Sequence, residues 1–211
     1  AVEKSWISKR IKGASVSVIP LIHDEPLSSA AFTDRSGILF IGSWNHPPNR
    51  DAIDFLVDEI MPLVWSKEPG IYLHLVGSDH PSDLAVTEQR IVCHGWVEST
   101  EELFNEVKLS VAPLRYGAGL KGKVAESFCR GVPVVGTSVA FEGFNIGECE
   151  KLIMAETAEG LTERIVDLHR KETAWEKVRE KMHTEVTETL GPERVAEKLK
   201  GALVSVMRVK A

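Results

Sequence analysis

The stretch from Ser110 to Phe144 constrains the fold of this chain more than any other part of the sequence. It starts at the end of an apolar run and continues through a glycine-rich loop into a segment whose apolar residues recur at helical spacing. Gly131 is placed to end that helix, and Pro133 cannot continue it. Another apolar run, residues 132–136, follows at once. The order of strand, loop, helix and strand predicts one unit of an α/β fold.

Basic residues at the start of the predicted helix break a local preference. Helix N-termini carry partial positive charge and unpaired N–H groups, so acidic residues are favoured there. Here the first turn carries Lys121 and Lys123, and Arg115 precedes them. An anion held by the N–H groups of the glycine-rich turn and by the two ammonium groups would explain this arrangement. The alternative is that both lysines are solvated and the glycines serve only the turn.

Glu126 lies one turn into the same helix, close to the predicted anion site. It also has a simpler interpretation, as the middle of an exposed ladder formed with Lys123 and Arg130 at spacings of three and four residues. Such pairs stabilise a helix by about 0.2–0.5 kcal/mol each. That gain is too small to require these particular residues.

The same residues resemble the donor-binding half of GT-B glycosyltransferases, specifically the large retaining group called group 1 or family four. In that family a glycine-rich loop follows a strand that ends in proline, and the next helix leads into a Gly-x-Pro-Val-Val sequence. Here the run from Ala125 to Val135, AESFCRGVPVV, corresponds, and GAGLKGK resembles a variant of the loop. The resemblance continues upstream through Ile38–Asn49 and Gly77, and downstream to the last helix.

The resemblance implies the C-terminal half of a GT-B fold, which is a doubly wound, Rossmann-like parallel sheet of about six strands. The sequence agrees, because short apolar runs alternate with helical segments. The expected strands are residues 38–41, 71–76, 92–94, 109–112, 132–136 and 152–154. The last helices are expected at about 157–170, 173–189 and 193–208. Ligands of such sheets bind at the carboxyl ends of the strands, where the glycine-rich loop lies.

Three regions follow from this comparison. Residues 1–34 are expected to be the end of an N-terminal domain, with a short strand at 16–19, and an interdomain linker. Residues 35–190 form the predicted nucleotide-sugar-binding domain, and 191–211 a helix that packs back toward the N-terminal domain. The chain opens at Ala1 without a starting Met, so we expect a fragment of a longer protein.

The loop after the first strand departs from the family pattern. Many members carry an Arg directly after the glycine that corresponds to Gly42, and here Ser43 takes that position. The resemblance implies that this loop approaches the donor's phosphates, and that the nucleotide base rests against the turns at Gly77 and Val97. Asn49 is a good N-cap for the helix that follows, and Pro62 should kink or end that helix.

The mechanism implied by the resemblance is transfer of a sugar from a UDP- or GDP-linked donor with retention at the anomeric carbon. Glu126 matches the second Glu of the family's paired-glutamate motif, whose role is to accept hydrogen bonds from the ribose hydroxyls. The position of the first Glu, which contacts the transferred sugar, holds Ala118. Lys121 and Lys123 would offset charge on the leaving diphosphate. The residues assigned to donor binding are Gly42, Ser43, Gly77, Val97, Arg115, Gly117, Gly119, Leu120 and Gly122, and those assigned to catalysis are Lys121, Lys123 and Glu126.

Composition excludes several other classes of protein. The net charge of −6 provides no basic field for nucleic acid. The three cysteines have no metal-ligand spacing, so no metal or cofactor is expected, and Cys93 and Cys129 are expected to be reduced core thiols. No apolar stretch reaches the roughly 18 residues of a membrane span, and a cytoplasmic location is expected. The expected partners are the sugar donor and an acceptor glycan, lipid or small molecule, bound mainly by the missing N-terminal domain. Membrane attachment through that domain stays open.

Two alternatives remain at this stage. The fold also hosts sugar-nucleotide epimerases, which need acids and bases facing the sugar, and no matching set is found in the sequence. A non-catalytic nucleotide-binding or assembly domain is the other alternative, favoured by Ser43 and Ala118 at positions where the family carries charge. Retention of Glu126 and the lysine pair argues against complete loss of the chemistry.

Overall fold

A parallel five-stranded sheet with the order β3-β2-β1-β4-β5 forms the centre of the molecule. In this computed structural model residues 2–11, 16–79 and 88–209 are described. The strands are β1 (Ile38–Ile41), β2 (Leu73–Val76), β3 (Ile91–Gly95), β4 (Leu109–Ala112) and β5 (Val134–Gly136). Because β1 lies in the middle, Ile38 pairs with Leu73 on one side and with Leu109 on the other.

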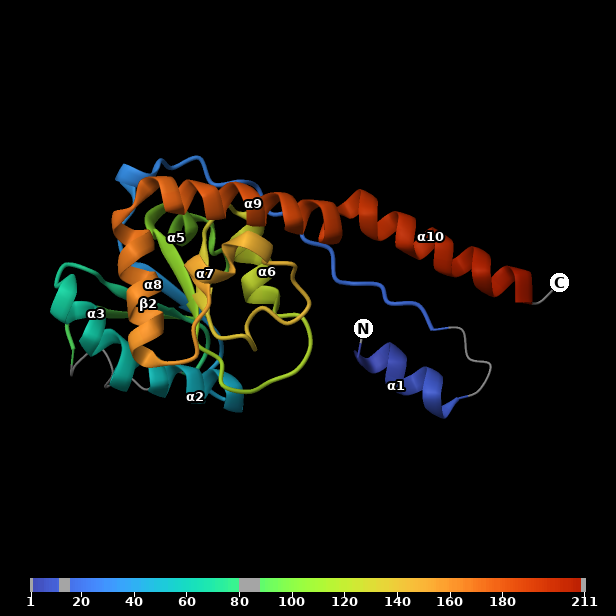
Figure 1. The fold of residues 1–211 in the computed structure, drawn as a ribbon, viewed down its shortest axis with the longest axis horizontal. Coiled ribbons are helices and arrows are strands. Elements are labelled where there is room, and N and C mark those ends of the chain that lie inside the picture. Colours follow the sequence, from blue (N-terminus) through green and yellow to red (C-terminus); the bar gives the residue numbers. More distant parts are fainter. Residues whose placement is uncertain (1, 12–15, 80–87, 210–211) are drawn as a thin grey trace.

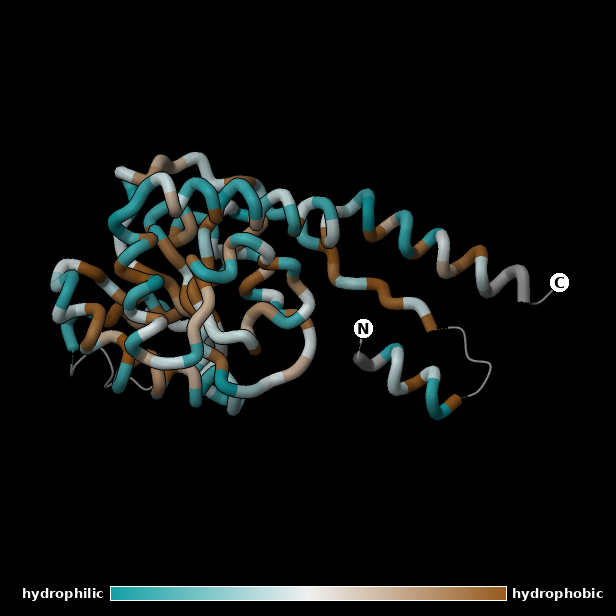
Figure 2. Tube along the Cα trace, viewed as in Figure 1, coloured by the Kyte–Doolittle hydropathy of each residue, from teal (hydrophilic) through white to brown (hydrophobic). Residues whose placement is uncertain are grey.

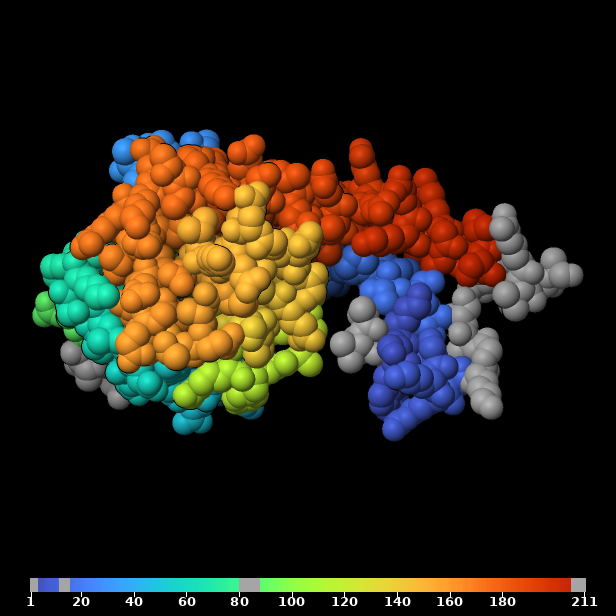
Figure 3. Space-filling model, in the orientation of Figure 1, coloured from blue at the N-terminus to red at the C-terminus, as the bar shows by residue number. Residues whose placement is uncertain are grey.

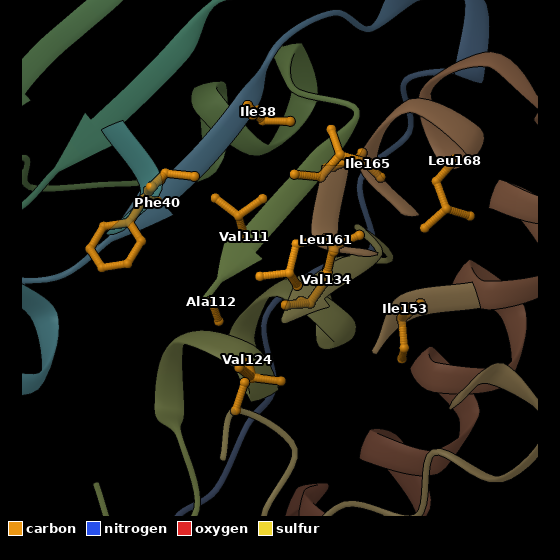
Figure 4. Packing of buried hydrophobic residues seen from close by; sticks show 14 of the residues in the cluster. Ile38, Phe40, Val111, Ala112, Val124, Val134, Ile153, Leu161, Ile165 and Leu168 are labelled. Carbon is orange, nitrogen blue, oxygen red and sulfur yellow. The ribbon is translucent and has the colours of Figure 1, made fainter. Parts of the chain in front are cut away.

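The central strand β1 is apolar at every position because both faces of the sheet are covered. Successive side chains point to opposite faces, so Phe40 belongs to the larger core cluster and Leu39 to a smaller one with Val107. In Figure 4, Leu161 and Ile165 of α8 (Ala158–Arg170) point toward the sheet. The sheet is therefore covered by helices on both sides, as the alternating pattern predicted.

The helices that cover the sheet have the following bounds. The elements between β1 and β2 are α2 (Pro47–Phe55), the π-helical η2 (Leu56–Ile60) and α3 (Met61–Lys67). Next come α5 (Glu101–Glu106) and α6 (Gly122–Cys129). The C-terminal part adds η3 (Gly147–Cys149), α7 (Glu150–Ile153), α9 (Glu172–Leu190) and α10 (Pro192–Val209). Of the C-terminal helices, α8, α9 and α10 lie within two residues of their predicted bounds.

The predicted end of the helix at Pro62 was wrong, because the helical path continues from Pro47 to Lys67, and the predicted kink there stays a prediction. The wide π turn of η2 comes just before Pro62, which occupies one of the first two positions of α3. Proline has no N–H to donate to the preceding turn, which fits an irregular π turn at this point of a continuous helix.

Two predicted strands are absent. Leu152–Met154 was expected to be the sixth strand, but α7 occupies most of it and Met154 forms only an isolated bridge with Gly136. An apolar run this short fits a buried helical turn as well as a strand. Residues 16–19 form neither a strand nor a helix, and Val18 and Ile19 are exposed. A strand needs a neighbour to bond with, and no strand lies beside these residues in the described chain.

The buried Arg35 ties the start of the sheet domain to the segment before β4. Its guanidinium donates hydrogen bonds to the backbone oxygens of Phe104 at 2.6 Å and Val107 at 3.0 Å. A third bond reaches the Ala30 oxygen at 3.0 Å. Only 2 % of Arg35 is exposed, so these carbonyls replace the water that the cation gives up.

Two segments project from the globular part, and both lie on the same side of the molecule (Figure 1). They are α1 (Val2–Arg10) and α10, and the space-filling view shows both standing clear of the sheet domain (Figure 3). The chain from residue 16 to η1 (Phe32–Asp34) carries apolar residues outside the globular part, seen in brown in Figure 2. Leu21 in this segment is 75 % exposed. Among the described residues, no helix has the length and apolar character needed to cross a membrane.

Candidate functional site

Three turns meet at the carboxyl edge of the sheet and are joined by backbone hydrogen bonds. The N–H of Gly42, after β1, donates to the oxygen of Val76 at 2.8 Å. The N–H of Gly77, after β2, donates to the oxygen of Gly95 at the same distance. The first two turns were both predicted to face the ligand, and the structure brings them together.

Gly42 and Gly77 approach so closely that a side chain cannot be added to Gly77. A Cβ atom on Gly77 would lie 2.2 Å from the Gly42 oxygen, and Gly77 has a φ of +140°. The Ser78 hydroxyl donates to the Ser43 hydroxyl at 3.0 Å, which ties the same two turns again. Glycine therefore allows a tight backbone platform at this edge.

The glycine-rich loop leads into the start of α6 on the same edge. Gly117 and Gly119 have positive φ angles of +138° and +77°. A Cβ on Gly119 or Gly122 would meet no atom of the described chain within 4 Å, so the space beside this turn is open. Lys121 is the N-cap residue and makes no side-chain capping bond, which leaves the first N–H groups of α6 for another acceptor.

The two lysines of this turn have different partners. Lys121 donates through Nζ to the backbone oxygen of Gly119 at 2.5 Å and lies 3.4 Å from a carboxylate oxygen of Glu142. Lys123 donates to Oδ1 of Asn49 at 2.6 Å, and its Nζ lies 4.3 Å from the centroid of the Phe40 ring. Burial, and then the positive charge of Lys121, lower the pKa of Lys123 to about 7.

The prediction that Asn49 caps the second helix was wrong. The helix α2 begins at Pro47, two residues earlier, with His46 in the capping position. Proline at the first helical position has its φ already set for the helix, which favours the earlier start. The Asn49 side chain is thereby placed one turn further, where it faces Lys123.

Glu126 projects from α6 toward the turn before α5. The Thr100 hydroxyl donates to its Oε1 at 2.5 Å, and Nε of Arg130 lies 3.5 Å from the same oxygen. Of the predicted exposed ladder only the Glu126–Arg130 pair is present, with Arg130 buried, while Lys123 bonds to Asn49 instead. Both partners of Glu126 contact Oε1, so Oε2 has acceptor capacity for a ligand hydroxyl.

Other predicted residues lie at the margin of this group. Val97 is half-buried and packs on the smaller core cluster, in the loop that leads to Thr100. Leu120 is 37 % exposed. Arg115 is held away from the glycine-rich loop, because its guanidinium donates two bonds to Asp51 of α2 at 2.9 and 2.6 Å. The structure therefore gives Arg115 a partner that the sequence analysis did not consider.

Sequence reasoning missed three residues that hold the site together. Asn49 was expected to be a helix cap, Arg130 was placed only in an exposed ladder, and Thr100 was given no role in the site. Their side chains fix Lys123 and Glu126. The sequence offers no signal for the pairs from Thr100 and Asn49, because the partners are 26 and 74 residues apart.

The arrangement can bind an anion beside a group with paired hydroxyls. The ammonium groups and the free N–H groups of α6 suit the anion, and the Glu126 carboxylate suits the hydroxyls. In the described ranges, no group of three His, Cys, Asp or Glu side chains is placed to hold a metal ion.

Comparison with known proteins adds a family and a fold. A sequence model described as glycosyl transferases group 1 matches residues 35–171. A search of curated proteins gave no match. Among solved structures, a TarM variant from S. aureus in complex with Fondaparinux, alpha-GlcNAc-glycerol and UDP superposes with a TM-score of 0.78 at 17 % identity. That match covers 95 % of this chain and 42 % of the other.

Two further structures give the same result. Sucrose-phosphate synthase from Thermosynechococcus elongatus has a TM-score of 0.71 and 19 % identity, over 99 % of this chain and 57 % of that one. The C-terminal domain of LpcC from Francisella tularensis, a glycosyl transferase group 1 family protein, has a TM-score of 0.57 and 14 % identity, over 76 % of this chain and 90 % of that domain. The chain thus spans about half the length of the first two structures, and matches most of an isolated C-terminal domain.

Proposed function

Because this chain belongs to the glycosyl transferases of group 1, we propose that it supplies the donor-binding half of an enzyme that transfers a sugar from a nucleotide diphosphate sugar with retention at the anomeric carbon. The observation that carries this proposal is the Lys123 amine beside the uncapped start of α6 and the loop after β1. Helix N–H groups and an ammonium group are the donors that a diphosphate accepts.

Glu126 is the group that we assign to the nucleoside. A carboxylate accepts two hydrogen bonds from a diol, and the ribose of a nucleotide carries one. The contacts from Thr100 and Arg130 restrict Glu126 to one orientation, so less rotamer entropy is lost when a ligand binds. The turns at Gly77 and Val97 lie on the side where the base would rest.

Lys121 and Lys123 are the groups that we assign to the leaving diphosphate. Negative charge grows on that group as the bond to the sugar breaks, and fixed positive charges lower the barrier. In the unliganded chain Lys121 bonds to Gly119 and pairs with Glu142. Binding of the diphosphate would exchange those two partners for phosphate oxygens.

Recognition of the sugar must differ from the usual family pattern, because Ala118 replaces the first Glu of the motif. The open space beside Gly119 and Gly122 leaves backbone N–H groups of this loop accessible to the sugar or phosphates. The S. aureus TarM variant was solved with UDP, which supports a uridine donor as the first candidate, with GDP as the second.

The acceptor is proposed to bind elsewhere. The chain spans about half of TarM and of sucrose-phosphate synthase, so a second domain would complete the cleft. An acceptor glycan, lipid or small molecule would bind mainly to that domain. The chain alone would then bind nucleotide weakly and turn over little, because an open half-cleft does not exclude water.

Calorimetric titration of the chain with UDP and with GDP tests the proposal. We expect one of them to bind, and Glu126→Ala to weaken it about 10- to 100-fold, as expected for loss of hydrogen bonds to a charged group. Glu102→Ala is the matched control, since Glu102 is an exposed acid on the neighbouring α5 and should leave the affinity unchanged.

Two results would contradict the proposal. If neither nucleotide binds at millimolar concentration, the domain has no donor site of its own. If Glu126→Ala and Glu102→Ala behave alike, Glu126 does not contact the nucleoside. For retention, the first sugar anomer that appears by proton NMR during turnover should match the donor, and the opposite anomer would refute that part.

A further inference from the structure

One side chain joins the two parts of the candidate site, which are the loop after β1 and the start of α6. Asn49 accepts a hydrogen bond from Lys123 Nζ through Oδ1 at 2.6 Å, and donates from Nδ2 to the backbone oxygen of Ser43 at 3.2 Å. Asn49 belongs to α2, Lys123 to α6, and Ser43 to the loop after β1. The amide therefore links Lys123, the predicted phosphate-binding lysine, to the loop after β1, in which Ser43 takes the position of the family's Arg.

The orientation of this amide is fixed by chemistry and by space. A backbone carbonyl only accepts, so a flipped amide would place its oxygen against the Ser43 oxygen, acceptor against acceptor. A Cβ atom on Gly42 would lie 2.6 Å from Asn49 Cγ, which shows that the amide packs directly on the Gly42 backbone. Asn49 can hold the Lys123 amine in only one way.

The carboxylates near Lys123 have other cationic partners. Glu126, the nearest acid on the same helix, contacts Thr100 and Arg130, and Asp51 of α2 pairs with Arg115. From the loop side the charged neighbour is Lys121, which repels a second cation. Lys123 forms no ion pair within the described ranges, and burial with this repulsion lowers its pKa to about 7.

We propose that Asn49 is a positioning residue for the Lys123 amine, and that a nucleotide diphosphate binds to this chain together with one proton, which Lys123 takes up. The inference rests on the proposed function, because it requires the diphosphate beside α6. The step balances as one amine and one proton from solvent giving one ammonium group. The negative charge of the bound phosphates favours the ammonium form of Lys123 and so drives proton uptake by its amine.

The sign of the pH dependence follows from linkage. Binding requires the ammonium form, so affinity falls as the pH rises through the pKa of free Lys123. With that pKa near 7, the dissociation constant for UDP or GDP should rise about 50-fold between pH 7 and pH 9. The terminal phosphate of the nucleotide is already ionised in this window, since its own pKa lies near 6.

Three variants separate the contribution of the lysine from that of the amide. Lys123→Arg keeps a permanent charge, so its affinity should be nearly constant from pH 7 to 9. Asn49→Asp places a carboxylate against the amine, keeps it protonated to higher pH, and should also remove the dependence, although its added charge weakens binding overall. Asn49→Ala should lower affinity and keep the dependence. If Asn49 has a purely structural role, the pH profile of Asn49→Asp will match that of the unaltered chain.

A second measurement does not need nucleotide. Carbon-13 labelled lysine in the nucleotide-free chain should give one side-chain resonance with a midpoint near pH 7, absent in Lys123→Arg and moved to higher pH in Asn49→Asp. An ordinary lysine midpoint for Lys123 would overturn the inference. So would nucleotide binding whose affinity does not change between pH 7 and 9, and this result would leave the proposed function standing. Absence of binding by either nucleotide at every pH would overturn the proposed function and this inference with it.

Discussion

Replacing Gly77 by Ala should destabilise the close contact between the turns at Gly42 and Gly77, which forms one edge of the candidate site. Two separate costs arise at this position. At a φ of +140° the backbone lies in a region that residues with a Cβ rarely adopt, which costs about 1–3 kcal/mol. The new Cβ would also lie 2.2 Å from the Gly42 oxygen, and backbone must move to relieve that contact, at a further cost of about 1–3 kcal/mol.

The net effect is smaller than the sum of these costs. Alanine restricts the unfolded chain more than glycine does, which returns about 0.4–1 kcal/mol. We therefore expect Gly77→Ala to lose about 3 kcal/mol of unfolding free energy, or about 6–12 °C in melting temperature for a domain of this size. Urea denaturation followed by tryptophan fluorescence measures this directly.

Two other glycines separate the contributions. Gly95 has a φ of +67°, and a methyl group added there would meet no atom of the described chain within 4 Å, so Gly95→Ala should show the backbone cost alone, about 1 kcal/mol. Gly70 has neither constraint, and Gly70→Ala should change stability by less than about 0.5 kcal/mol. If Gly77→Ala costs no more than Gly95→Ala, the argument from the close approach of the two turns is refuted.

Two further predictions concern stability. Arg35→Met should destabilise the chain by about 2–4 kcal/mol, because the carbonyls of Phe104 and Val107 stay buried without their donor; a loss below about 0.5 kcal/mol in urea denaturation would contradict this. Burial, followed by the charge of Lys108, lowers the pKa of His169 to about 4, so the unfolded chain binds a proton there that the folded chain refuses between pH 6.5 and 4. Stability should therefore fall by about 1–2 kcal/mol between pH 7 and pH 5 relative to His169→Gln, and equal slopes in the two proteins would refute the assignment.

Much of the fold could be predicted from the sequence because both faces of the sheet are buried. An unbroken apolar run marks β1 at its observed bounds, and β4 is marked by an apolar run with Ser110 as its one polar residue, since strands covered on both sides favour apolar residues. The strand prediction for Leu152–Met154 was wrong because three apolar residues fit either a strand or a turn of helix. The strand prediction for residues 16–19 was wrong because a strand depends on a partner that lies outside the segment itself.

The candidate site was predictable in position and less so in detail. The glycine-rich loop and the turns at Gly42 and Gly77 lie on one edge because parallel strands end together. Side-chain pairs between distant elements could not be predicted, and these decide the chemistry. Lys123 is held by Asn49, and Arg115 is turned toward Asp51, across separations of 74 and 64 residues.

The central place of β1 in the sheet has a consequence for how the domain is made. β1 comes first in the chain among the strands of this sheet, yet one of its neighbours, β4, is the fourth. A chain growing from its N-terminus must leave one edge of β1 unpaired until residues 109–112 have emerged, and an unpaired apolar edge invites aggregation. Contacts between distant residues also slow folding. The loop after β1 and the start of α6 can meet only after this pairing. A shortened chain ending before β4 would therefore have an incomplete sheet and no place to bind an anion.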